Sequence, residues 1–305
     1  MKRFAAAWLR DERGNAAVLV GLALLLMLTA TGLVMDGGAM YAAKSHLQKA
    51  ANAAALSGAQ ELTGEETDVR SVVEEILAKH GEQADLTMED VKMGDSLRVH
   101  LRKKVPLGFS RLLGKEEATV EAEAAARISP MGSAEGVAPL GIDESIPLEF
   151  NKTYKLKVDS SGVEAGYFGV LALGGPGAST YESNLRYGYQ SEIKLGDIID
   201  TQTGNIAGKT RDGIQWRIDS DPYPSGDYSH RDSPRVILIP VYRPYNQTSN
   251  QLKQIQVTGF AYFYIAEPMS SKDTSITGMF IERTGTGYAQ PGADVKGAYA
   301  IRLIE

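Results

Sequence analysis

Cysteine is absent from this 305-residue chain, which excludes disulfide bonds, thiolate metal sites and cysteine nucleophiles together. Histidine is scarce, and its four copies are scattered along the sequence: His46, His80, His100 and His230. Such dispersed histidines predict no metal site. A chain without thiols cannot form unwanted disulfides in an oxidising exterior, so the composition is consistent with an exported protein. The net charge of −6 gives no general reason to expect nucleic acid as a partner.

Charge is also missing from one long segment, residues 16–35. As a helix with a rise of about 1.5 Å per residue, this run is about 30 Å long, which matches the hydrocarbon thickness of a bilayer. Asp36 follows the run at once. Basic residues precede it: Lys2, Arg3, Arg10 and Arg13. Positive charge stays on the cytoplasmic side, so we expect a cytoplasmic N-terminus and everything after Asp36 outside.

A cleavable signal peptide is the alternative interpretation of this segment. Gly37, Gly38 and Ala39 are small enough to form a cleavage site. The apolar part of a signal peptide has only about 7–15 residues, however, and the run here is longer. The length therefore favours a permanent anchor.

Helix-forming sequence continues beyond the span. Residues 39–62 contain no proline and are rich in Ala, Leu, Gln, Lys and Glu. Ala50, Ala54 and Gly58 recur at i, i+4 and i+8, which makes a strip of small residues along one face. Such a strip admits a close helix from another subunit, or it packs inside this chain; both interpretations stay open. Gly37-Gly38 is a candidate hinge between the two halves.

The elements of the N-terminal part follow a specific order. A charged turn around Gly14 precedes the span, Asp36 stands at its outer edge, Tyr41 follows, and an alanine-rich tail fills residues 47–59. This order resembles the N-terminal module of the TadE/TadG-like family of Flp (Tad) pilus-assembly proteins. The resemblance implies anchoring and lateral packing, without a catalytic residue. Prepilin processing after Gly14 expects glutamate at the fifth following position, where Leu19 stands, so we expect the chain to remain uncut there.

Residues 63–130 predict a helix and two strands. Apolar residues of helical spacing follow Thr67, the candidate N-cap, and Gly81 ends the pattern. Residues 97–105 and 118–128 both alternate apolar and polar side chains, as strands do. Paired side by side, they would place glutamates opposite arginines: Glu121 and Glu123 opposite Arg98 and Arg102. The basic run at 102–104 is then a solvated face rather than a lipid or nucleic-acid site.

The stretch 130–136 is rich in Pro, Gly and Ser and predicts a domain boundary, with a linker at 131–138. The composition changes beyond it. Short β-like runs separated by turn residues argue for a β-sandwich or barrel. Ser179 and Glu182 have the spacing of a capping box, which predicts one short helix to about Gly188. The expected strands are 154–158, 168–173, 193–199, 215–218, 236–242, 255–265, 276–281 and 298–304.

Two stretches imitate phosphate and calcium sites. Residues 204–210 resemble a P-loop but have three residues between the glycines instead of four, and Asp212-Gly213 should break the following helix. No nucleotide is therefore expected. Three carboxylates suggest calcium: Asp219, Asp221 and Asp227. Tyr223 and Pro224 stand where an EF-type loop needs an oxygen ligand and glycine, which leaves a non-EF loop open beside a solvated turn.

Two further motifs carry no chemistry of their own. The stretch 229–232 places a hydroxyl, an imidazole and a carboxylate side by side, whereas catalytic triads assemble from distant positions. The glycines at 174–177 predict a turn, because no helix and acidic residue complete a dinucleotide fingerprint. The sequence therefore assigns no catalytic residue, cofactor or metal ligand.

We therefore expect an α+β protein with an N-terminal transmembrane helix, extended into a pilin-like helix plus β-hairpin, and a C-terminal mainly-β domain. The expected order is a cytoplasmic tail (1–14), the transmembrane helix (15–36), a pilin-like stalk (37–130), the linker (131–138) and an extracytoplasmic β-rich domain (139–305).

The leading function hypothesis is a structural component of a Tad pilus or related secretion apparatus in the cell membrane. Its partners would be the lipid bilayer and other pilus-assembly subunits, contacted through the N-terminal helix. The alternative is a cell-surface binding module for cell-wall carbohydrate or a protein. An anchored hydrolase would need a nucleophile–base pair or a metal cluster that this sequence does not offer, so we expect no enzyme.

Overall fold

The computed structural model describes the chain apart from residues 1–11, 160–166, 203–205, 249–250, 271–272 and 305. It divides into two compact units. Unit 1 consists of Met1–Ala55, Val73–Asp90 and Arg98–Ala124. Unit 2 consists of Leu56–Val72, Val91–Leu97 and Ala125–Glu305.

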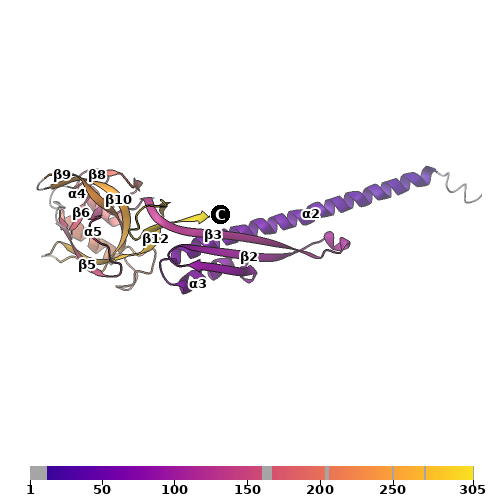
Figure 1. Cartoon of the computed structure of the whole chain (residues 1–305), viewed down its shortest axis with the longest axis horizontal. Coiled ribbons are helices and arrows are strands. Elements are labelled where there is room, and N and C mark those ends of the chain that lie inside the picture. Colours follow the sequence, from indigo (N-terminus) through magenta and orange to yellow (C-terminus); the bar gives the residue numbers. More distant parts are fainter. Residues whose placement is uncertain (1–11, 160–166, 203–205, 249–250, 271–272, 305) are drawn as a thin grey trace, which may run out of the picture. The chain divides into compact units, whose positions relative to one another are not determined.

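A single long helix, α2 (Glu12–Gly58), contains both the apolar span and the alanine-rich tail (Figure 1). The helix runs through Gly37-Gly38 without interruption, so the expected hinge is a regular helical segment. By length and composition α2 can cross a membrane, and only 6% of its most apolar window is buried. The expected long N-terminal apolar helix is confirmed.

The small-residue strip of α2 packs inside the chain. Ala50 and Ala54 are fully buried, and Gly58 is buried as well. On the same helix, Gln48 donates a hydrogen bond of 2.7 Å to the backbone oxygen of Glu123 in strand β3. The strip therefore serves the packing of this chain rather than a surface for another subunit.

Helix α3 (Glu66–His80) follows the short helix η1 (Ala59–Glu61). Its first turn begins one residue before Thr67, because the carbonyl of Glu65 accepts the N–H groups of Asp68 and Val69. Thr67 is thus inside the helix rather than its N-cap. Gly81 ends α3 as expected, with φ of +71°.

The hairpin of unit 1 confirms the alternating pattern. Its elements are η2 (Gln83–Asp85), β1 (Leu86–Lys92), β2 (Ser96–Pro106), η3 (Ser110–Leu113) and β3 (Glu117–Ala134). The predicted ion pairs are present: Arg102 Nε lies 2.8 Å from Glu121 Oε1, and Arg98 pairs with Glu123. Both pairs are half exposed, so they fix strand register more than they add stability.

The expected linker is absent from the described residues 131–134, which form the end of β3 instead. Here β3 pairs with two short strands, β7 (Ile193–Lys194) and β13 (Gly287–Ala289). Backbone hydrogen bonds to these two strands give the stretch the partners of a regular strand, although its Gly and Ser residues are typical of a loop. β3 crosses from unit 1 to unit 2 at Ala124–Ala125.

Unit 2 is built on a curled sheet in which β11 pairs with both β5 and β10, so the strands β11-β5-β6-β4-β9-β10 close into a ring. Closure removes exposed sheet edges, as in a barrel. The strands of the ring are β4 (Leu140–Asp143), β5 (Thr153–Asp159), β6 (Tyr167–Val170), β9 (Val236–Thr248), β10 (Gln251–Ile265) and β11 (Ser275–Ile281). Outside the ring, β8 (Ile198–Asp200) pairs with β10, and β14 (Ala298–Ile304) pairs with β3 and with β12 (Arg283–Gly285). The mainly-β expectation is confirmed.

Aromatic residues fill the core of this ring. Phe263 packs edge-on against Phe168 and Phe280, with ring centroids 5.2 and 5.1 Å apart. These rings and their aliphatic neighbours are fully buried. These three aromatic residues therefore contribute to the core rather than to a binding surface.

Two helices join the core, and one of them corrects a predicted strand. They are α4 (Ala178–Tyr187) and α5 (Ala207–Asp219). Residues 215–218 belong to α5, where Ile214 and Ile218 lie one turn apart and both face the core. Gly213 does not break α5, because its missing side chain lets Leu185 of α4 approach; a Cβ there would lie 2.7 Å from Leu185 Cδ2.

Smaller differences concern where elements begin and end. The predicted strand 193–199 is two short strands, β7 and β8, around a turn at Gly196 with φ of +91°. The predicted strand 168–173 ends at Val170. Helix α4 is present, but its N-cap is Gly177 rather than the expected Ser179. Gly174–Gly177 form the expected turn.

Candidate functional sites

The first site is Asp36, which immediately follows the apolar span on α2. Its carboxylate is 7% exposed and accepts backbone N–H groups from Gly108 at 2.8 Å, Phe109 at 3.1 Å and Ser110 at 2.6 Å. These three donors belong to the loop between β2 and β3. Charge-assisted hydrogen bonds of this kind are among the stronger ones in proteins, so Asp36 fastens the loop to the helix.

One turn before Asp36, the same loop touches the span itself. A Cβ at Gly32 would lie 2.5 Å from Phe109 Cβ, closer than side chains tolerate. Glycine at this position therefore permits the loop to lie against α2. The sequence marked Asp36 as the edge of the span, but its backbone partners lie more than 70 positions away and follow no sequence pattern.

A polar cluster forms the second site in unit 1. Glu82, whose side chain is 4% exposed, lies between His46 Nδ1 at 2.8 Å and the Lys103 ammonium. Asp85 lies 3.3 Å from the same ammonium. The position of Lys103 in β2 falls on the inward face between Leu101 and Val105, which are both buried. The sequence placed Lys103 on a solvated face, so this cluster was missed.

The protonation of this cluster follows from its contacts. Burial raises the pKa of Glu82, but hydrogen bonds with Asp85, Lys103 and His46 outweigh it and hold that pKa below its ordinary value. Burial and the neighbouring Glu82 raise the pKa of Asp85. The pKa of Lys103 is also raised, because the two carboxylates outweigh its burial. The cluster thus holds an ion pair between α2, η2 and β2.

In unit 2 the stretch 229–232 makes structural contacts with other elements. Arg231 donates to the backbone oxygens of Gln60 and Thr284 and lies 2.9 Å from Glu61 Oε1. His230 stacks on Tyr223 with ring centroids 3.6 Å apart. The stretch thus joins η1 to β12 and holds the imidazole against another ring, which does not correspond to a catalytic triad.

The three aspartates considered for calcium have separate partners. Asp221 pairs with Arg235 at 3.1 Å, Asp219 accepts from Gln215 at 2.7 Å, and Asp227 lies 3.3 Å from His230. Among the described residues no three carboxylates or imidazoles are grouped for a metal ion. Each carboxylate is neutralised or bonded by a different neighbour, so the structure does not bring them together.

The P-loop-like stretch lies partly outside the described residues, since 203–205 are not among them. Its lysine, Lys209, forms an ion pair of 2.6 Å with Glu182 of α4. Thr210 is fully buried and lies 3.0 Å from the hydroxyl of Tyr181. Through these contacts Lys209 and Thr210 join α5 to α4.

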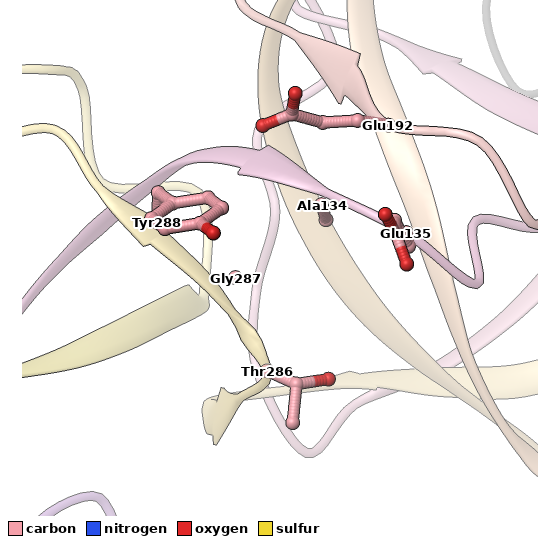
Figure 2. Close-up of a pocket in the computed structure, with 6 residues that line it drawn as sticks. All are labelled: Ala134, Glu135, Glu192, Thr286, Gly287 and Tyr288. Carbon is pink, nitrogen blue, oxygen red and sulfur yellow. The ribbon is translucent and has the colours of Figure 1, made fainter.

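A groove in unit 2 is a further candidate site. It has a volume of about 330 Å³ and lies where β13 pairs with the end of β3 (Figure 2). A second hollow of about 560 Å³ shares two of its residues, Glu192 and Tyr288. We call the two hollows the Tyr288 groove. Its first hollow is lined by Ala134, Glu135, Glu192, Thr286, Gly287 and Tyr288.

The groove combines an aromatic ring with carboxylates. Tyr288 is 75% exposed, although most of the described aromatic side chains of unit 2 are buried or half-buried. The hydroxyl of Ser133 at 2.6 Å and the ammonium of Lys194 at 3.0 Å lower the pKa of Glu192, so this carboxylate is charged at neutral pH. An exposed ring beside hydrogen-bonding carboxylates suits recognition of a hydroxyl-rich or peptide ligand.

Comparison with known proteins identifies the N-terminal part of the chain. The family described as Flp pilus-assembly TadE/G-like matches residues 14–61. No curated protein matches the chain, and no solved structure does. The matched residues run from Gly14, just before the apolar span, to the end of η1. The N-terminal segment of this chain is therefore similar to the TadE/G-like proteins of Flp pilus assembly, as the order of its sequence elements predicted.

Proposed function

We propose that this chain is a membrane-anchored structural component of a Tad (Flp) pilus or a related secretion apparatus. The observation that carries the proposal is the coincidence of the family match with one continuous helix. Residues 14–61 contain a segment long and apolar enough to cross a membrane, and it continues into the packed part of unit 1. In this proposal the N-terminus lies in the cytoplasm and the β-rich unit 2 is displayed outside.

The bilayer and other pilus subunits are the proposed partners of α2. Because the strip at Ala50 and Ala54 is buried in this chain, contact with other subunits falls to the apolar span. Leu26 and Val34 there are 70% and 74% exposed, which leaves their surface to lipid or to neighbouring helices. The role is structural, and no catalytic step belongs to the proposal.

Deletion of the gene and complementation test this function. Cells without the protein should lose their Tad filaments, and the full chain should restore them. Filaments that persist in the deletion strain would contradict an assembly role. Topology is tested on intact cells with an impermeant maleimide, because the chain has no cysteine of its own. The thiol of a Tyr288→Cys variant should react from outside; reaction only after lysis would overturn the orientation.

The Tyr288 groove favours a second function, a surface binding module for cell-wall carbohydrate or a protein. The observation is the exposed ring of Tyr288 in a groove that Glu135 and Glu192 also line. Tyr288→Ala should abolish adhesion while filaments remain intact. Tyr245→Ala, which removes another ring that is 58% exposed, is the matched control. Equal adhesion by both variants and the natural chain would exclude the groove as a binding site.

A further inference from the structure

The loop between β2 and β3 carries apolar side chains that no part of the described chain covers fully. Leu112 is 84% exposed and Phe109 is 39% exposed. Both line a recess of about 220 Å³ whose other walls are Leu25, Leu28, Thr29 and Leu33 of the span. The exposed surface of the loop is therefore continuous with the surface of the candidate membrane helix.

The position of the recess along α2 gives its depth. Its helical residues lie 3 to 11 positions before Asp36, which corresponds to about 4 to 16 Å along the helix axis. If Asp36 marks the outer edge of the hydrocarbon, the tip of the loop lies below that edge. Figure 1 shows the β2–β3 hairpin running along α2 toward the span.

Several backbone groups of the loop have hydrogen-bond partners within the protein and do not need water. The N–H groups of Gly108, Phe109 and Ser110 bind the carboxylate of Asp36. Leu112 donates to the carbonyl of Phe109, and Leu107 donates to that of Glu116. An unpaired backbone group costs several kcal/mol in hydrocarbon, and these bonds remove that cost for the groups that they join.

Charged residues of both signs flank the apolar tip. Arg111 lies 3.7 Å from Glu116, and Lys104 lies 2.5 Å from Glu117. Both cations are 70% exposed, and Lys115 is exposed as well. Long basic side chains of this kind keep their charge at the headgroup level while the neighbouring apolar side chains enter the lipid.

We infer that residues 107–112 are a second membrane contact, in which Phe109 and Leu112 insert among the lipid acyl chains of the extracytoplasmic leaflet. This inference rests on the proposed anchoring of α2. Asp36 holds the loop against the helix, and lipid covers the apolar surface that the chain leaves open. The protein then meets the bilayer with a helix and a loop, which restricts rotation and tilt of unit 1.

Spin labels on single cysteines test this inference, because the natural chain has none to remove. The full chain is placed in nanodiscs of phosphatidylglycerol and phosphatidylethanolamine, with a nitroxide at position 112, 26 or 41. Collision with oxygen reports lipid exposure, and collision with a nickel chelate reports water exposure. Leu26→Cys is the control for the span, and Tyr41→Cys, at a side chain 77% exposed on the same helix, is the aqueous control.

The label at 112 should resemble that at 26, with an oxygen-to-nickel collision ratio several-fold above that at 41. A label at 112 that behaves as at 41, while 26 lies in lipid, overturns the loop contact and leaves the anchor intact. Low access to both reagents at 112 means coverage by protein and also overturns the inference. An aqueous label at 26 overturns the anchor and the loop contact together.

Discussion

Replacing Gly32 by alanine is the most direct test of the contact between α2 and the loop that joins β2 and β3. The new Cβ would lie 2.5 Å from Phe109 Cβ, an atom too close to the backbone for a rotamer change to relieve. Overpacking costs about 1–3 kcal/mol, and a clash with an atom that no rotamer change can move falls in the upper half of that range, about 2–3 kcal/mol. Alanine gains about 1 kcal/mol over glycine within a helix. The net effect is a loss of about 1–2 kcal/mol, which opens the loop roughly 5–30-fold more often.

Hydrogen exchange of the full chain in nanodiscs measures this effect. The amides of Gly108, Phe109 and Ser110, protected by Asp36, should exchange roughly 5–30-fold faster in Gly32→Ala. Gly38→Ala is the matched control, because a Cβ there meets open space in the described part of the chain. Equal exchange in the two variants would refute the steric argument.

A double substitution isolates the contact. Phe109→Gly removes the ring and the Cβ that a methyl group at position 32 would meet. In that background Gly32→Ala should add little further exchange, so the two changes are strongly non-additive. Additive effects would mean that Gly32 acts through the helix alone.

Three further changes test other contacts. Asp36→Asn turns an amide toward the loop's N–H donors, so exchange of 107–114 should accelerate more than in Gly32→Ala. Glu82→Gln leaves Asp85 as the one carboxylate beside Lys103. Urea unfolding should then show a free energy of unfolding that is lower by roughly 2–3 kcal/mol. This is less than the loss for a fully buried ion pair, because the side chain of Lys103 is a third exposed. Hydrogen bonds from Lys155 and Ser275 lower the pKa of Asp273 from 3.8 to about 2, so its stabilisation is present above pH 3.8 and disappears as pH falls toward 2. In urea titrations the gap between the natural chain and Asp273→Asn should close over that interval.

Each of these has an exposed counterpart as a control: Asp90→Asn, Glu74→Gln and Asp294→Asn. These variants should keep the loop exchange, the urea midpoint and the acid profile of the natural chain. A control that reproduces the effect of its partner variant would assign that effect to net charge rather than to the contact. A pH-independent gap for Asp273→Asn would contradict its lowered pKa.

The hairpin of unit 1 shows how far local pattern reaches. Strict alternation at 118–128 predicted a strand although the composition favoured a helix, and β3 contains all of it. Burial of every second side chain outweighs intrinsic propensity when a facing surface is available. The alternating pattern did not predict the inward position of Lys103. Its charge is stabilised there by Glu82 and Asp85. These two carboxylates lie at η2, so their positions cannot be inferred from the sequence of β2.

Helix α5 shows that tertiary packing can override the local propensity of a sequence. Asp212-Gly213 is a helix breaker by propensity, which costs roughly 1 kcal/mol for glycine. Close packing on Leu185 of α4 offsets that cost, because only glycine leaves room for the neighbouring side chain. The run 215–218 is too short to distinguish a strand from a buried helical turn by its period.

The sequence by itself determined the apolar span, its continuation as a helix, the resemblance to TadE/G-like proteins and the mainly-β character of the C-terminal part. These depend on hydrophobic period and run length, which are local properties of the chain. Only the tertiary structure decided that the strip at Ala50 and Ala54 is internal, that three backbone amides bind Asp36 and that Tyr288 is exposed beside Glu192. Such features join residues distant in sequence, and they exist only where packing brings backbone and side chains within hydrogen-bond or van der Waals distance.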